Sequence, residues 1–142
     1  MLQLIDWQNT STWHILVVED ELENLEVIAE TLEFLGAQVQ TARNGKEGLT
    51  VLETFMPDFI LTDLSMPVMD GWEMRSHIRS DPRFATIPVV ALSAHVIAGD
   101  KERALEAGFD GYLTKPIDIF TLLDDIRVAL GQPAVQKKDV TA

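Results

Sequence analysis

Acidic, hydroxyl and amino side chains follow four of the short apolar runs in this sequence. They are Glu19 and Asp20, Asp63, Ser93, and Lys115. Three carboxylates, one hydroxyl and one ammonium could together hold a divalent cation and handle a phosphoryl group. Taken singly, each residue is also a common turn, cap or surface residue. Their joint chemistry therefore depends on whether the fold brings them to one place.

The apolar runs have the length and the β-branched content of strands, and three of them are almost continuously hydrophobic. Such runs are typical of a parallel sheet that is covered on both faces. The predicted strands are His14–Val18, Ala37–Thr41, Phe59–Thr62, Pro88–Leu92 and Gly111–Leu113.

Segments of helical period separate these runs. Apolar residues recur every three or four positions from Leu22 to Leu35, and Gly36 ends that pattern. The other predicted helices are one marked by Leu49, Leu52 and Phe55, one from Asp70-Gly71, one over about 100–107, and one capped by Asp118 and ending at Gly131.

Five successive β–α units predict an α/β fold. With right-handed crossovers they form a three-layer sandwich, in which a parallel sheet lies between two layers of helices. Ligands of such sheets bind beyond the carboxyl ends of the strands. We therefore expect the five side chains named above to meet at one edge of the sheet. The second strand ends in Ala42-Arg43-Asn44 and contributes no acid.

The expected cluster is electrostatically unbalanced. Two carboxylates about 4 Å apart repel by roughly 4 kcal/mol at an effective dielectric constant near 20. Lys115 alone does not offset three of them, so either one acid is protonated or a divalent cation binds. Oxygen ligands without nearby His or Cys favour a hard cation, and Mg²⁺ suits a few carboxylates completed by water.

The composition bounds the kind of protein. The chain has 142 residues, no cysteine and a formal net charge of −12, which predicts one domain that carries no disulfides. The negative charge disfavours binding to nucleic acid or to an anionic membrane, and no apolar run is long enough to span a bilayer. We expect a soluble, cytoplasmic domain over 14–131. Residues 1–13 and 132–142 are expected to be mobile extensions, although Trp7 and Trp13 leave docking of the first extension as an alternative.

Four separated stretches of the sequence resemble one known family, the receiver domain of two-component response regulators. They are HILVVEDE (14–21), DFILTDLSMPVMDGWE (58–73), IPVVALSAH (87–95) and AGFDGYLTKPI (107–117). The resemblance covers about 14–130 and implies a flavodoxin-like fold with strand order 2-1-3-4-5. Residues 93–117 look more like single-domain cell-division regulators and hybrid-kinase receivers than like the chemotaxis type.

The resemblance also implies a role for each site residue. Asp63 is the expected phosphoacceptor. Glu19, Asp20, Asp63 and the backbone carbonyl of Ser65 are the expected Mg²⁺ ligands, with Mn²⁺ as a possible substitute. Glu19 stands where Asp is commoner in the family. Lys115, followed by a cis peptide bond to Pro116, and Ser93 are expected to contact the phosphoryl group, and Tyr112 is the expected switch aromatic.

The function implied is a phosphorylation-dependent switch and not an enzyme. A sensor histidine kinase or a histidine phosphotransfer protein would phosphorylate Asp63, and a downstream protein would read the surface of the fourth helix, fifth strand and fifth helix. One alternative is a receiver removed from a hybrid kinase that acts as a phosphorelay intermediate. Another is a Mg²⁺-dependent phosphatase with an aspartate nucleophile, but Ser65 stands where that class needs a second Asp. A flavodoxin is disfavoured, because the loop after the first strand is acidic.

The first predicted helix carries a run of acids. Glu23, Glu26, Glu30 and Glu33 recur at helical spacing, and no Lys or Arg occurs between residues 14 and 42. The simpler interpretation is a solvated face. The alternative is that these acids steer a basic partner, because kinases and phosphotransfer domains of the family dock beside this helix.

Overall fold

A computed structural model describes residues 5–94 and 99–131 of the chain. Five parallel strands form one sheet in the order β2-β1-β3-β4-β5, so the predicted α/β fold and strand order are confirmed. The strands are β1 (His14–Val18), β2 (Gln38–Ala42), β3 (Phe59–Asp63), β4 (Val89–Ser93) and β5 (Gly111–Thr114).

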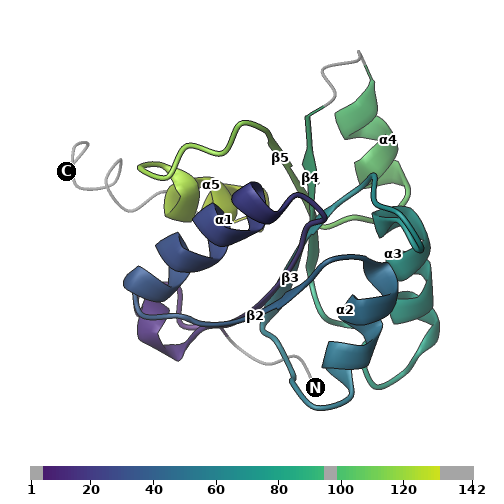
Figure 1. Cartoon of the computed structure of the whole chain (residues 1–142), viewed down its shortest axis with the longest axis horizontal. Helices are drawn as coiled ribbons and strands as arrows, with labels where there is room; N and C mark the ends of the chain where they lie inside the picture. Colours follow the sequence, from purple (N-terminus) through teal and green to yellow (C-terminus); the bar gives the residue numbers. More distant parts are fainter. Residues whose placement is uncertain (1–4, 95–98, 132–142) are drawn as a thin grey trace.

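Five α-helices alternate with the strands. They are α1 (Leu22–Phe34), α2 (Gly45–Leu52), α3 (Gly71–Ser80), α4 (Asp100–Glu106) and α5 (Leu122–Ala129). Figure 1 shows α1 and α5 on one face of the sheet and α2, α3 and α4 on the other. The sheet is thus the middle layer of a three-layer sandwich.

The residues of β1 divide between two cores, because successive side chains of a strand point to opposite faces. Ile15 and Val17 pack with α1 and α5, whereas Leu16 and Val18 pack with α2 and α3. All four side chains are fully buried. This explains why the run is continuously hydrophobic instead of alternating.

Two of the α-helices start at side-chain caps. The carboxylate of Asp70 accepts a hydrogen bond from the backbone N–H of Glu73 (2.8 Å) at α3, as the sequence indicates, and Asn44 accepts one from Glu47 (2.9 Å) at α2. These caps satisfy backbone donors that have no partner within the helix. Helix α1 begins after Glu21 without a side-chain cap.

The predicted start of α5 at Asp118 is wrong. The helix begins at Leu122, after Thr121. The Asp118 carboxylate accepts a hydrogen bond from the N–H of Phe120 (2.9 Å), and its carbonyl accepts one from Thr121 (3.2 Å). Asp118 therefore closes a turn ahead of the helix, which is the other common use of this residue type.

The segment before β1 docks on the domain. Trp13 is fully buried and its indole N–H donates to the carbonyl of Asp6 (2.8 Å). Trp7 stacks on Phe59 and meets Trp13 edge to face, with ring centroids 6.3 and 5.5 Å apart. The expectation of a mobile extension is thus wrong for 5–13, where the docking alternative holds. Residues 132–142 lie outside the described part of the chain.

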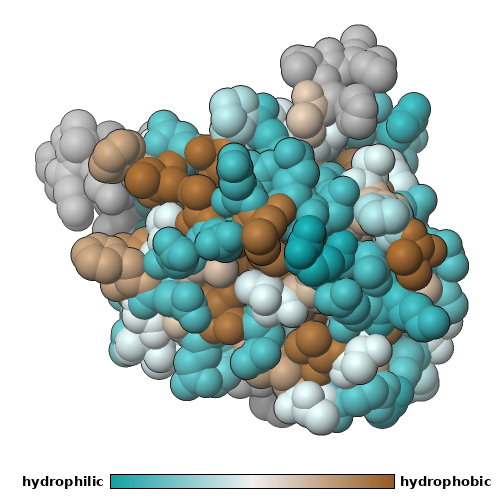
Figure 2. All heavy atoms as spheres, in the orientation of Figure 1, coloured by the Kyte–Doolittle hydropathy of each residue, from teal (hydrophilic) through white to brown (hydrophobic). Residues whose placement is uncertain are grey.

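Most of the visible surface is hydrophilic, with hydrophobic side chains gathered over the side where α1 and α5 lie (Figure 2). Phe34 at the end of α1 and Phe120 before α5 are 88% and 92% exposed, and both line a groove of about 640 Å³. Within residues 5–94 and 99–131, no helix is long and apolar enough to cross a membrane.

Candidate functional site

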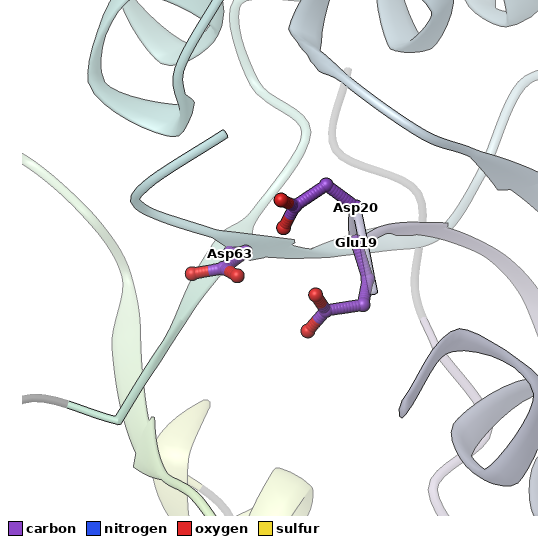
Figure 3. A group of neighbouring side chains, drawn as sticks. All are labelled: Glu19, Asp20 and Asp63. Atoms are coloured by element: carbon purple, nitrogen blue, oxygen red, sulfur yellow. The ribbon is translucent and has the colours of Figure 1, made fainter. Parts of the chain in front are cut away.

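Three carboxylates meet beyond the ends of β1 and β3. Glu19 and Asp20 follow the last residue of β1, and Asp63 is the last residue of β3. The register pairs Val18 with Thr62 in these neighbouring strands, which brings the acids to the same level. Each acid offers an oxygen within 4.8 Å of the others, and Figure 3 shows the three carboxyl groups gathered at this edge.

Lys115 brings an ammonium group into the same cluster. Its Nζ lies 2.9 Å from Oδ2 of Asp63 and forms an ion pair with Oε1 of Glu19. The backbone N–H of Lys115 donates to the carbonyl of Ser93 (2.9 Å), which fixes the chain just beyond β5. The following peptide bond to Pro116 is cis, as the family resemblance implies.

Burial makes the electrostatics of this cluster strong. Glu19 is fully buried, and desolvation, together with the charge of Asp63, raises the pKa of its carboxyl above the usual value despite the contact with Lys115. Burial lowers the pKa of Lys115, but its hydrogen bonds to Glu19 and Asp63 outweigh this effect and raise that pKa overall. Lys115 thus stays charged between two acids.

The donor set fits a hard cation. The three clustered ligand atoms are carboxylate oxygens, and one ammonium faces three acids, which leaves negative charge for a divalent ion to neutralise. Oxygen donors without sulfur or imidazole select ions such as Mg²⁺ over Zn²⁺ or Cu²⁺. The cluster Glu19, Asp20 and Asp63 could therefore hold a metal ion.

The loop after β3 approaches the backbone of Asp63 closely. The N–H of Ser65 donates to Oδ1 of Asp63 (3.2 Å) and that of Gly71 donates to the carbonyl of Leu64 (3.0 Å). A Cβ atom at Gly71 would lie 2.2 Å from the carbonyl oxygen of Asp63, so only glycine fits there. Val68 in this loop has a φ of 70°, which is rare for a β-branched residue.

The two expected switch residues lie in neighbouring strands. Ser93 is the last residue of β4, is buried (2% exposed), and pairs in register with Thr114. Tyr112 lies in β5, two residues before its end, and its half-buried ring packs against the core that includes α3 and α4. Ser93 thus lies one residue beyond Leu92, the register partner of Asp63, whereas Tyr112 lies further inside the sheet.

Arg43 contacts the site, and this contact was not predicted from the sequence. It follows β2 directly, and its Nε and Nη2 both donate to the backbone carbonyl of Asp20, at 3.2 and 2.7 Å. Its position at the end of a strand was the available signal, because the residues that cluster here also follow or end strands.

Comparison with known proteins identifies the family of this chain. Residues 15–127 match the family model of the response regulator receiver domain. The chain is 32% identical to the polar-differentiation response regulator DivK of Brucella anthropi, over 82% of this chain and 95% of that protein. It is 39% identical to the sensor histidine kinase RcsC of Salmonella typhimurium, over 80% of this chain but only 12% of that protein.

A solved structure resembles the fold closely. The receiver domain of the sensor histidine kinase PA1611 from Pseudomonas aeruginosa aligns with a TM-score of 0.74 at 33% identity, over 84% of this chain and 98% of that one. A magnesium ion is coordinated in the active site cleft of that protein. This chain belongs to the response regulator receiver domain family of two-component signalling.

Proposed function

We propose that the chain is a phosphorylation-dependent switch whose Asp63 accepts a phosphoryl group from a phosphohistidine. The donor is a sensor histidine kinase or a histidine phosphotransfer protein, and transfer takes place in the cytoplasm. The observation that carries this proposal is the position of Asp63, whose Oδ2 lies 2.9 Å from Lys115 within the three-acid cluster. A carboxylate between a cation and a metal site suits phosphoryl transfer.

In the proposed reaction an oxygen of Asp63 attacks phosphorus in line with the donor's P–N bond. The O–P bond forms as the P–N bond breaks, and the electron pair of that bond remains on the imidazole. Lys115 pairs with the phosphoryl oxygens as their charge develops, and the Ser93 hydroxyl donates a hydrogen bond to the product. Asp63 acts as an acceptor in this reaction and not as a turnover catalyst.

Glu19, Asp20, Asp63 and the carbonyl of Ser65 would hold Mg²⁺, for which Mn²⁺ can substitute. When bound, the ion supplies positive charge next to the phosphoryl oxygens. Glu19 is the longer homologue of the commoner Asp. Because its carboxylate reaches Lys115, we assign Asp20 and Asp63 as the principal ligands and Glu19 as an assisting one.

Phosphorylation would be read through protein contacts. Ser93 and Tyr112 lie on adjacent strands, with Ala91 of β4 paired in register with Tyr112. A shift of Ser93 toward the phosphoryl group would therefore change the packing of Tyr112. The surface of α4, β5 and α5 is the proposed output surface. The downstream protein partner binds this surface in only one of the two states, phosphorylated or unphosphorylated.

The likeness to both DivK and RcsC supports two settings for this switch. It works either as a stand-alone regulator or as a receiver of a hybrid kinase that passes the phosphoryl group on. The phosphatase alternative is the weaker one, because Ser65 replaces the second Asp that such enzymes need, and the Ser65 contact with Asp63 comes from its backbone.

The test is labelling of the intact chain by a small phosphodonor such as acetyl phosphate with Mg²⁺. We expect one phosphoryl group per chain by mass spectrometry, sensitive to hydroxylamine as an acyl phosphate is. Asp63→Asn should abolish it, whereas the matched variant Asp118→Asn should be labelled normally. Stoichiometric, Mg²⁺-dependent labelling of Asp63→Asn would overturn the proposal, and sustained turnover of a phosphomonoester would favour the phosphatase.

A further inference from the structure

The loop that carries Asp20 is held from the side by the neighbouring strand. Asp20 lies between the end of β1 and Leu22, the first residue of α1. Its carbonyl oxygen accepts both hydrogen bonds from the guanidinium of Arg43, at 3.2 Å from Nε and 2.7 Å from Nη2. Two donors on one planar group fix a position and an orientation, which one donor on a flexible chain does not.

Arg43 is itself held by its own neighbours. Its backbone N–H donates to Oε1 of Glu47 (3.0 Å), while the N–H of Glu47 donates to the Asn44 cap (2.9 Å). One residue earlier, the carbonyl of Ala42 accepts from the N–H of Glu19 (3.0 Å). The end of β2 and the start of α2 therefore form a fixed base from which Arg43 reaches Asp20.

The Asp20 loop needs this support because α1 starts without a side-chain cap. Other contacts of the loop run through Glu19: its N–H donates to the carbonyl of Ala42, its carboxylate pairs with Lys115, and Oε2 accepts from the N–H of Glu21 (3.0 Å). The Asp20 carboxylate must also stay close to Asp63 against like-charge repulsion. A loop free to move would relieve that repulsion by separating the two acids.

We propose that Arg43 is a positioning residue of the metal site, which holds the Asp20 loop through the backbone and so sets the site's affinity for divalent cations. This inference rests on the proposed function, because it assigns the acids to a metal. Residues that orient metal ligands typically change affinity about 10- to 100-fold when removed. Arg43 is exposed, so we expect a loss of about tenfold, at the lower end of that range.

The direction in which Mg²⁺ affinity changes when Arg43 is removed distinguishes a positioning role from a purely electrostatic one. Removal of a cation near three acids should tighten binding of a divalent ion by Coulomb's law alone. Positioning predicts the opposite, weaker binding. Lys46 provides the matched control, because it is an exposed cation in the first turn of α2, three residues after Arg43. Lys46→Ala removes the same charge but leaves the Arg43 contact in place.

The experiment is Mg²⁺ titration by calorimetry of the intact chain and its Arg43→Ala, Arg43→Lys and Lys46→Ala variants. Amide hydrogen exchange of residues 19–22 in EDTA serves as a metal-free readout. We expect about tenfold weaker Mg²⁺ binding and faster exchange for Arg43→Ala, partial rescue by Arg43→Lys, and unchanged or tighter binding for Lys46→Ala.

Unchanged or tighter Mg²⁺ binding by Arg43→Ala would overturn the inference, as would an equal loss in Lys46→Ala. If Arg43→Ala unfolds, the conservative variant Arg43→Lys provides the test. Mg²⁺ affinity and amide exchange equal to those of the wild type in Arg43→Lys would also contradict the positioning role. Failure of the proposed function looks different, because the wild-type chain itself would then bind no Mg²⁺ or accept no phosphoryl group.

Discussion

Nζ of Lys115 lies 2.9 Å from Oδ2 of Asp63, and the lysine side chain is only 9% exposed. Lys115 thus offsets part of the charge of the buried acids Glu19 and Asp63. We expect Lys115→Met to lower the free energy of unfolding in EDTA by about 2 to 4 kcal/mol, because it leaves buried carboxylates unpaired. Urea denaturation measures this loss, and added Mg²⁺ should restore part of it.

The control for that variant is Lys101→Met on α4, where the lysine is exposed. A surface substitution of this kind should change stability by no more than about 0.5 kcal/mol. Equal losses in the two variants would mean that Lys115 does not neutralise the site.

Glu19 should make the metal-free protein less stable as pH rises. Burial raises the pKa of its carboxyl above the reference value of 4.5, so the folded state holds this proton more tightly than the unfolded state does. The stabilising contribution is therefore complete below pH 4.5 and is lost as pH rises through the folded-state pKa.

Replacement of Glu19 by Gln removes this titration. The stability of Glu19→Gln relative to wild type in EDTA should increase from pH 4.5 upward and then level off. Urea denaturation at a series of pH values measures the difference. A difference that is independent of pH, or that falls as pH rises, would contradict the assignment.

The elements and the acidic site follow from local patterns in the sequence. The five strands were predicted to within one residue at each end, because both faces of the sheet are covered and each strand is a short apolar run bounded by turn residues. The acids were expected to meet because the carboxyl ends of parallel strands share one edge. Glu19, Asp20 and Asp63 do meet there.

What the sequence did not reveal depends on contacts between distant residues. Arg127 in α5 donates from Nε to the carbonyl of Trp7 (3.0 Å), 120 positions earlier in the chain. No local pattern encodes that contact, so the docking of 5–13 remained one of two alternatives. The contact between Arg43 and Asp20 joins residues 23 positions apart, and it was not predicted for the same reason. The prediction that Asp118 caps α5 was wrong for a different reason, since an Asp suits a turn as well as a helix cap.

Val68 places strain in the loop that approaches Asp63. Its φ of 70° lies in the left-handed region, which costs an ordinary L-residue about 1 to 2 kcal/mol. Asn tolerates this conformation better, and Val68 is exposed, so Val68→Asn should stabilise the protein by about 0.5 to 1 kcal/mol. Thermal or urea unfolding checks this. Val27→Asn on α1 is the control and should bring no gain, because Val27 is helical.

The acidic surface of α1 should control how fast the phosphodonor associates. Glu23, Glu26, Glu30 and Glu33 are all exposed, and they create a field that attracts a basic partner and weakens with salt. The double variant Glu26→Lys/Glu30→Lys should slow association with the kinase or phosphotransfer protein about tenfold at low salt, and much less at high salt. Stopped-flow measurement of phosphotransfer at several salt concentrations gives both values.

Glu102→Lys on α4 reverses an exposed charge on the other face of the sheet and should leave the rate nearly unchanged. An association rate independent of salt in the wild-type chain would mean that these acids form only a solvated face.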